Sequence, residues 1–145
     1  MNKQVAFSSI ILELHVPDFK VAIAFYSKLG FEIAWQRPPK GRSGYLVMRK
    51  GDSVLAFFCG NEEVYNHPFF KRYPKNTPKG FGVEICLYLS DELIDDYYKH
   101  VIKSLGKECV VEELKMKPWR SKDFRIIDPF GYYICVREPN NILEP

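Results

Sequence analysis

Two acidic side chains are the first candidates for chemistry in this 145-residue sequence. Glu13 and Glu84 each interrupt a short apolar stretch whose alternation is typical of a β-strand with one buried face. Carboxylates on the opposite face could accept hydrogen bonds from a cationic or hydroxyl-bearing ligand. They could also transfer protons if burial raised one pKa. The alternative is that both are ordinary solvated strand residues.

The histidines and cysteines are weaker candidates. His15 could carry a proton, but a single histidine near the end of a strand is more often structural. His67 and His100 fit a surface or a linker, and no histidine is placed to activate Cys135 as a nucleophile. The cysteines lack the CxxC spacing of structural zinc, so we expect free and mostly buried thiols, as in a reducing compartment. They are Cys59, Cys86, Cys109 and Cys135.

The composition excludes several classes of protein. Hydrophobic residues make up 46% of the chain, which suits one domain spanning residues 1–145. The net charge is +3 and the basic residues are scattered, which argues against nucleic-acid binding. No apolar run approaches the roughly 20 residues of a membrane helix, and the N-terminus lacks the features of a signal peptide. We therefore expect a cytoplasmic protein with neither membrane nor nucleic acid as a partner.

An internal repeat organises the chain. Ser27–Ala34 (SKLGFEIA) reappears about 76 residues later as Lys103–Val110 (KSLGKECV), and each copy follows a strand and a helical pattern. This order predicts two strand–helix–strand–strand–strand modules at about 8–60 and 80–138. The connector at 61–79 should hold a helical turn at Glu62–Asn66. Half a domain of this size could hardly bury its own sheet, so the modules should pack together.

Turn and capping residues set the expected boundaries of the elements. The first half should contain a strand at 10–16, a helix that Asp18 caps and Gly30 ends, and strands at 31–36, 45–49 and 54–58. The second half should contain a strand at 83–89, a helix that Ser90-Asp91-Glu92 caps and Gly106 ends, and strands at 108–113, 123–127 and 132–137.

Several motifs add to the repeat. They are Leu14-His-Val-Pro-Asp18, Ala24-Phe-Tyr26, Leu29-Gly-Phe31 and Asp128-Pro-Phe-Gly131. Together they resemble the vicinal oxygen chelate superfamily, which includes glyoxalase I, extradiol dioxygenases, fosfomycin-resistance enzymes and bleomycin-resistance proteins. The segment Lys117–Phe124 is most similar to the bleomycin-resistance branch, although Pro118-Trp119-Arg120 lacks that branch's glycine. The resemblance covers about residues 8–138. It implies an α+β fold in which two βαβββ modules form a curved mixed sheet around a pocket, with the helices on the outer face.

The resemblance also implies which residues meet a ligand. Strand alternation places Leu12, Leu14 and Val83 under the helices and turns the opposite strand face to the pocket. Trp35 and Trp119 fall where bleomycin-resistance proteins stack their ligand, although either could be a core residue. Arg120 could neutralise an anionic group or pair with nearby acids. The expected ligand-binding residues are Trp35, Trp119, Glu13, Glu84, Cys135, Tyr133 and Arg120.

The metal enzymes of this superfamily carry ligands at three positions that correspond here to Ile11, Glu84 and Cys135. The enzymes typically have His, then His or Gln, then Glu at such places. Isoleucine cannot bind a metal, and one carboxylate with one thiol is a mismatched pair. We therefore expect no metal and no other cofactor, with a divalent metal as the alternative.

The resemblance predicts non-catalytic, metal-independent sequestration of a small organic molecule by a homodimer. One alternative is a metal-dependent lyase, isomerase or dioxygenase of the same superfamily. Another is a metabolite-sensing or accessory binding domain. Bleomycin is cationic and this chain is net basic. The resemblance therefore supports similarity to the bleomycin-resistance branch more than binding of bleomycin itself, although Glu13 and Glu84 could still form a local acidic pocket.

Overall fold

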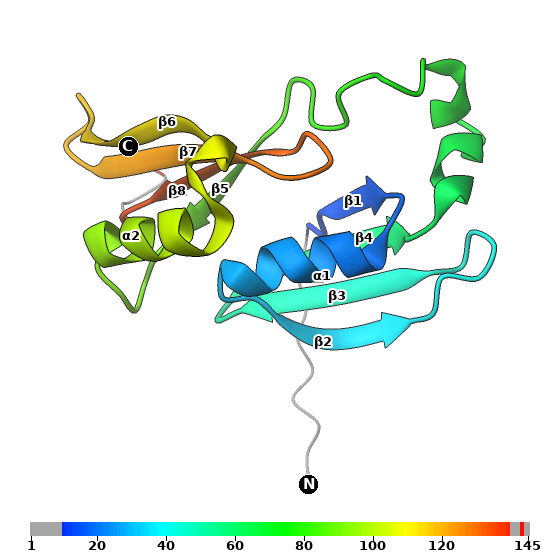
Figure 1. The fold of residues 1–145 in the computed structure, drawn as a ribbon, viewed down its shortest axis with the longest axis horizontal. Helices are drawn as coiled ribbons and strands as arrows, with labels where there is room; N and C mark the ends of the chain where they lie inside the picture. Colours follow the sequence, from blue (N-terminus) through cyan, green and yellow to red (C-terminus); the bar gives the residue numbers. More distant parts are fainter. Residues whose placement is uncertain (1–9, 140–142, 144–145) are drawn as a thin grey trace, which may run out of the picture.

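Two βαβββ modules follow one another in the computed structural model, which describes residues 10–139 and 143 (Figure 1). The first module contains β1 (Glu13–Val16), α1 (Phe19–Lys28), β2 (Glu32–Arg37), β3 (Tyr45–Lys50) and β4 (Ser53–Cys59). The second contains β5 (Glu84–Tyr88), α2 (Ile94–Leu105), the short 3-10 helix η3 (Lys107–Cys109), β6 (Val110–Met116), β7 (Lys122–Ile127) and β8 (Tyr133–Arg137). The connector carries η1 (Glu62–Asn66), at the predicted place, and η2 (Phe70–Arg72). The predicted α+β order is confirmed.

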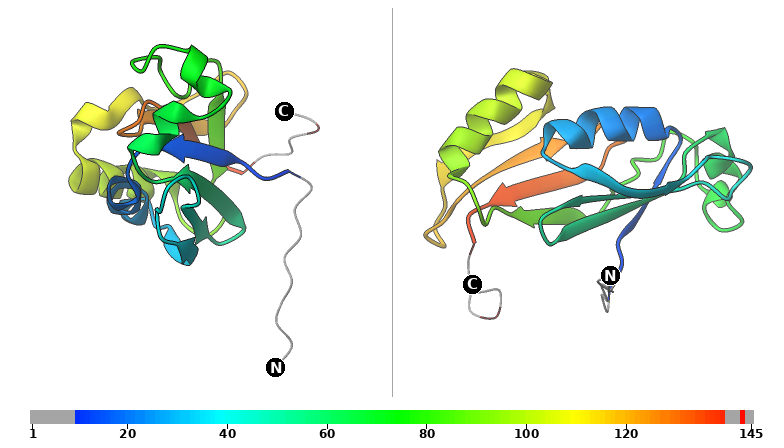
Figure 2. Two further views of the ribbon diagram at one scale, coloured as in Figure 1. Left: turned by 90° about the vertical axis from the view of Figure 1, so that its right-hand side faces the viewer. Right: turned by 90° about the horizontal axis from the view of Figure 1, so that it is seen from below.

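Each module builds its own four-stranded sheet. The strand orders are β1-β4-β3-β2 and β5-β8-β7-β6, with the first strand of each module parallel to its last. The two sheets lie side by side, so the single curved sheet that we expected is divided in two (Figure 1). Both helices cover the same side of this pair, which leaves the other side of both sheets open (Figure 2).

Strand alternation sorts most residues correctly between the two faces. The helix-side residues Leu14, Val16, Leu46 and Phe57 are at most 3% exposed, as the period of two predicts. Val83 is an exception, because β5 begins one residue later and the Val83 side chain is 54% exposed. Leu12 likewise precedes β1, is only half-buried, and packs at the edge of the core.

The two helices begin differently. The Asp18 carboxylate accepts hydrogen bonds from the backbone amides of Lys20 (2.8 Å) and Val21 (3.3 Å), so the predicted cap of α1 is confirmed. The predicted Ser90-Asp91-Glu92 cap is wrong, because Leu93 precedes the first turn of α2 and makes no side-chain cap bond. Two acids in that turn, at positions 95 and 96, favour the positive end of the helix dipole instead.

Buried tyrosines join the modules. The Tyr26 hydroxyl of α1 donates to the Asp128 carboxylate at 2.7 Å, and the Tyr97 hydroxyl of α2 donates to the Leu29 carbonyl at 2.5 Å. Asp128 also accepts the backbone amides of Phe130 (2.9 Å) and Tyr132 (2.8 Å). The Asp-Pro-x-Gly motif therefore forms a tight turn and, at the same time, docks the second module onto the first helix.

Candidate functional site

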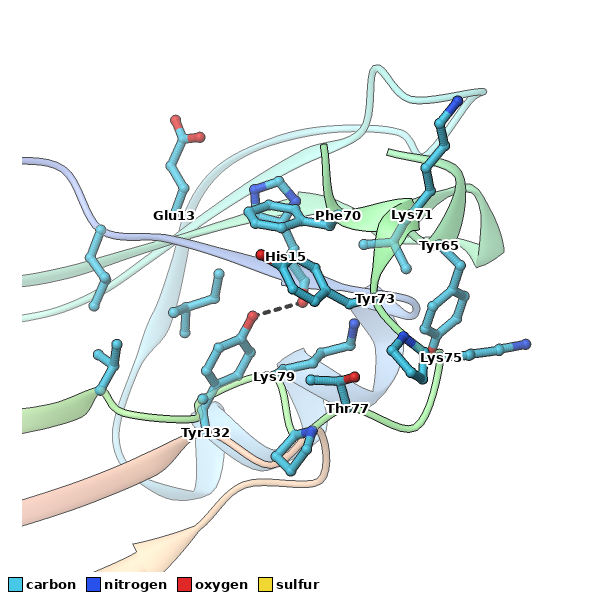
Figure 3. Close-up of a pocket in the computed structure, with 17 residues that line it drawn as sticks. Glu13, His15, Tyr65, Phe70, Lys71, Tyr73, Lys75, Thr77, Lys79 and Tyr132 are labelled. Carbon is cyan, nitrogen blue, oxygen red and sulfur yellow. Dashed lines mark hydrogen bonds between the residues drawn. The ribbon is translucent and has the colours of Figure 1, made fainter. Parts of the chain in front are cut away.

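A pocket of about 450 Å³ opens between β1 and the connector (Figure 3). Its walls come from three parts of the chain: the edge of β1, the connector with its two 3-10 helices, and the turn before β8. Its polar and aromatic lining includes His15, Tyr65, Phe70, Tyr73, Lys79 and Tyr132. This volume lies in the range of pockets that hold small organic molecules.

Local hydrogen bonds shape the connector wall. The Asn61 side chain caps η1 by accepting from the Glu63 amide at 2.9 Å. The His67 ring nitrogen Nδ1 accepts from the amides of Phe69 (3.1 Å) and Phe70 (3.2 Å), which fixes the chain direction into η2. These bonds present Phe70 to β1, and its ring lies 5.1 Å from the His15 ring.

His15 is the centre of an aromatic cluster. Its ring lies 4.9 Å from Phe58 and 5.1 Å from His67, and its Nδ1 is buried without a hydrogen-bond partner among residues 10–139. Burial, and after it the charge of His67, lowers the pKa of His15. A neutral ring in this packing supports the structural interpretation of His15. The Tyr132 hydroxyl completes the wall by donating to the His15 carbonyl at 2.9 Å.

Glu13 is among the residues that line the connector pocket, but its carboxylate points away from the pocket (Figure 3). Its carboxylate accepts the Tyr45 hydroxyl at 2.7 Å on the open face of the first sheet. Burial, followed by this hydrogen bond, raises the pKa of Tyr45 to about 12. Trp35 lies beside Tyr45, with 6.4 Å between the rings, and the Arg37 guanidinium lies 5.6 Å from the Trp35 ring. Trp35 is 52% exposed and is therefore not a core residue.

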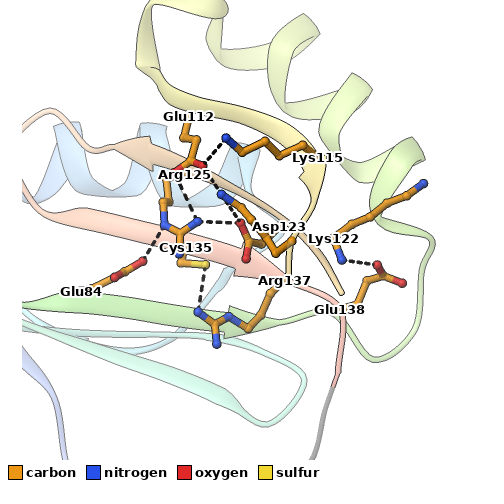
Figure 4. Close-up of polar contacts among 10 residues, drawn as sticks. Glu84, Glu112, Lys115, Lys122, Asp123, Arg125, Cys135, Arg137 and Glu138 are labelled. Atoms are coloured by element: carbon orange, nitrogen blue, oxygen red, sulfur yellow. Dashed lines mark hydrogen bonds and ion pairs between the residues drawn. The ribbon is translucent and has the colours of Figure 1, made fainter. Parts of the chain in front are cut away.

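The open face of the second sheet is ionic (Figure 4). Arg125 binds Glu84 at 2.9 Å, Asp123 at 2.6 Å and Glu112 at 3.4 Å. Lys117 also pairs with Glu112 and lies 3.5 Å from Asp123. Glu84 is thus neutralised by an arginine on its own sheet, and it does not share a partner with Glu13. Sequence reasoning missed Arg125, although polar residues at 123 and 125 alternate with apolar ones along β7.

Glu112 gives this network a predicted pH dependence. Hydrogen bonds from Lys117 and Lys115 lower the pKa of Glu112 from the ordinary 4.5 to about 2. The folded protein therefore binds this proton less readily than the unfolded chain, so the stabilisation is complete above pH 4.5 and is lost as the pH falls toward 2. We expect the melting temperature of the native protein to fall more steeply across this range than that of Glu112→Gln. Parallel curves for the two proteins would contradict the assignment.

The remaining expected site residues lie near this network. Tyr133 neighbours Glu84 on the adjacent strand, and burial raises its pKa. Trp119 is 44% exposed in the turn between β6 and β7, so it too lies outside the core. Its ring is 5.9 Å from the Lys117 ammonium. The structure thus assigns the expected residues to two open sheet faces and a turn.

The match to a family model covers residues 9–136, nearly the whole described chain, and its description is the Glyoxalase/Bleomycin resistance protein/Dioxygenase superfamily. The chain belongs to this superfamily. No curated protein matches.

Solved structures of the superfamily share the fold. A bleomycin resistance determinant encoded on the transposon Tn5 is 21% identical with a TM-score of 0.64, covering 93% of this chain and 100% of that one. A bleomycin-binding protein complexed with bleomycin is also 21% identical with a TM-score of 0.64, over 92% and 100%. A hypothetical protein from S. aureus is 22% identical with a TM-score of 0.67, over 94% and 97%. At these identities the likeness shows the fold alone.

The three positions at which the superfamily's enzymes carry metal ligands hold poor donors in this chain. Ile11 is 65% exposed and offers no donor atom. Glu84, Cys86 and Cys135 place ligand atoms within 4.8 Å of one another, but Arg125 already holds the carboxylate. Burial raises the pKa of Cys135 to about 11, which disfavours the thiolate form that ligates metals. This donor set does not fit a divalent cation.

The cysteine prediction is correct in part. All four are free, but only Cys59 and Cys135 are buried, while Cys86 is exposed. Within residues 10–139 and 143, no helix has the length and apolarity needed to cross a membrane.

Arg120 occupies a strained turn position. Its φ is +64°, in the left-handed region that favours glycine. We expect Arg120→Gly to raise the free energy of unfolding by about 0.5 kcal/mol, because the relief of strain exceeds the added entropy of the unfolded chain. Urea unfolding measures this change. The exposed turn residue Arg42, whose φ is not positive, provides the control, because Arg42→Gly should lower stability. A loss of stability in Arg120→Gly would contradict the expectation.

Proposed function

We propose that this protein binds a small organic molecule without a metal and without chemical conversion, in the pocket between β1 and the connector. The observation that carries the proposal is the pocket itself: about 450 Å³ of space, with aromatic rings on several sides and no cysteine among its lining residues. Aromatic faces favour planar ligands. The packing of His15 among aromatic rings and the poor metal donors support binding over catalysis. The free cysteines support the cytoplasmic location that we include in the proposal.

The test compares binding with turnover. Protein dialysed against EDTA is titrated by calorimetry with bleomycin and with a panel of planar aromatic compounds. The ligand is then recovered and weighed by mass spectrometry, with and without added Zn²⁺, Ni²⁺, Mn²⁺ and Fe²⁺. The proposal expects binding that EDTA leaves unchanged and ligand that is recovered intact. Conversion of any compound on addition of a metal would overturn the proposal in favour of a metal-dependent enzyme.

Variants locate the binding site. Phe70→Ala removes a ring from the connector wall and should weaken binding about 10-fold or more, the usual effect of truncating an aromatic contact. Phe81 lies outside the pocket and is 84% exposed, so Phe81→Ala is the matched control and should bind as the native protein does. Trp35→Ala and Trp119→Ala test the site expected from the sequence. If these two abolish binding while Phe70→Ala does not, the ligand occupies the open sheet faces.

The open sheet faces support a homodimer as part of the proposal. Trp35 and Val54 on the first sheet are 52% and 53% exposed, and Ile127 on the second is 41% exposed, which is costly in water. We expect twice the 17.0 kDa chain mass in sedimentation equilibrium. Trp35→Glu should shift the protein toward the monomer, whereas Phe81→Glu should not. A native monomer at high micromolar concentration would contradict this expectation.

A further inference from the structure

We propose that the ligand of the connector pocket is an organic anion, a planar ring system whose carboxylate binds Lys79. This inference rests on the proposed function and adds the charge of the ligand, which is opposite to that of bleomycin.

Lys79 is the cation that points into the pocket. Its ammonium enters the space between Tyr73, Thr77 and Tyr132 (Figure 3). The side chain is half-buried and forms no salt bridge within the described part of the chain. The Lys79 ammonium lies over the Tyr65 ring, 4.7 Å from the ring centroid. Burial lowers the pKa of Lys79, and the charge of Glu62 raises it only in part, which marks an ammonium that has lost part of its hydration without gaining a salt-bridge partner.

The other charged residues at the pocket compensate Lys79 only in part, because Glu62, the acid that acts on it, is shared with Lys75. Lys71 and Lys75 point outward, away from the cavity, and Lys75 is paired with Glu62 at 3.1 Å (Figure 3). Glu13, the one acid in the lining among residues 10–139, turns to Tyr45 on the opposite side of β1. The pocket therefore has a net positive field, which raises the local concentration of anions.

Neighbouring groups could complete an anion site. Tyr73 and Thr77 line the same pocket as Lys79, and their hydroxyl groups are hydrogen-bond donors as well as acceptors. A carboxylate at Lys79 would gain a charge-assisted hydrogen bond, while its ring system contacted Phe70 and Tyr132. A cationic ligand would instead meet an unpaired ammonium in a partly dehydrated site, which is unfavourable.

Three probes with the same ring system and different charges test this inference. They are 1-naphthoate, 1-naphthalenemethanol and 1-naphthylmethylammonium, titrated by calorimetry into the native protein. We expect naphthoate to bind about 10-fold or more tightly than the neutral alcohol, and the ammonium compound to bind more weakly than either. Lys79→Gln should remove the preference for naphthoate, and Lys79→Arg should retain it. Lys99→Gln, at an exposed lysine of α2, is the matched control and should change nothing.

The outcomes separate the two proposals. Equal affinity for all three probes, or preference for the ammonium compound, overturns the anion inference and leaves the pocket as a neutral or cationic site. A preference for naphthoate that survives in Lys79→Gln also overturns it, because the anion then binds elsewhere. If no probe binds, and Phe70→Ala also leaves the binding of the broader panel unchanged, the connector pocket itself is excluded. Thermal unfolding of each variant confirms that it is folded.

Discussion

Asp128→Ala is expected to lower the free energy of unfolding by about 3–5 kcal/mol. Asp128 is 4% exposed and accepts the Tyr26 hydroxyl and the amides of Phe130 and Tyr132. Its removal leaves three donors without a partner at the junction of the modules, and each unsatisfied buried donor costs about 1–3 kcal/mol, partly offset where water enters. Urea unfolding with an unchanged m-value measures the loss.

Two further variants define the cause. Tyr26→Phe removes only one of the three bonds and should cost about 1–2 kcal/mol. Asp91→Ala, at an exposed acid in the loop before α2, should be close to neutral. If Asp128→Ala costs no more than Asp91→Ala, the Asp-Pro-x-Gly turn does not hold the modules together and the account of the fold is wrong at this point.

Arg125→Met is expected to lower the free energy of unfolding by a similar amount, about 3–5 kcal/mol. Arg125 is 8% exposed and Asp123 is fully buried, so the substitution leaves a buried carboxylate without its closest partner and releases Glu84, while Glu112 keeps Lys115 and Lys117. Removing one member of a buried ion pair usually costs far more than the pair contributes. Urea unfolding again gives the magnitude.

Lys115→Met is the matched control for this network. Lys115 also binds Glu112, at 3.0 Å, but its side chain is 60% exposed, and exposed pairs contribute little. We expect a loss below about 1 kcal/mol. Similar losses for the two variants would contradict the buried network.

Arg125→Met also probes the metal alternative. A gain of tight Zn²⁺ binding in this variant would show that Arg125 keeps Glu84 from acting as a metal ligand.

Much of the fold could be predicted because its signals are local and repeated. The copies at Ser27–Ala34 and Lys103–Val110 mark the end of each helix and the start of the next strand, so the order of elements followed from them. The cap of α2 could not be predicted from Ser90 alone, because the choice between Ser90 and Leu93 depends on how the loop packs. The division into two sheets depends on strand pairing across the chain, which the repeat does not specify.

The candidate site was harder to predict because it lies where no repeat exists. The sequence predicted a connector at 61–79, long enough to be functional, but no site residue was expected in it, although Tyr65, Phe70 and Tyr73 form an aromatic density unusual for a solvated loop. This aromatic cluster could have been recognised in the sequence. The role of Lys79 could not, because the direction of its side chain into the pocket depends on the path of the connector past β1. Strand alternation placed Glu13 and Glu84 opposite the helices, as observed, but it predicted that both face one pocket, and they do not line a common pocket. Their partners, Tyr45 and Arg125, are set by neighbouring strands.

A crystal structure of the protein grown with 1-naphthoate tests the central claim most directly, because it shows where the small molecule binds. We expect the ring system of naphthoate to lie in the connector pocket, against Phe70 and Tyr132, in each copy of the chain. Naphthoate bound instead on an open sheet face beside Trp35 or Trp119, with the connector pocket filled only by water, would contradict this claim.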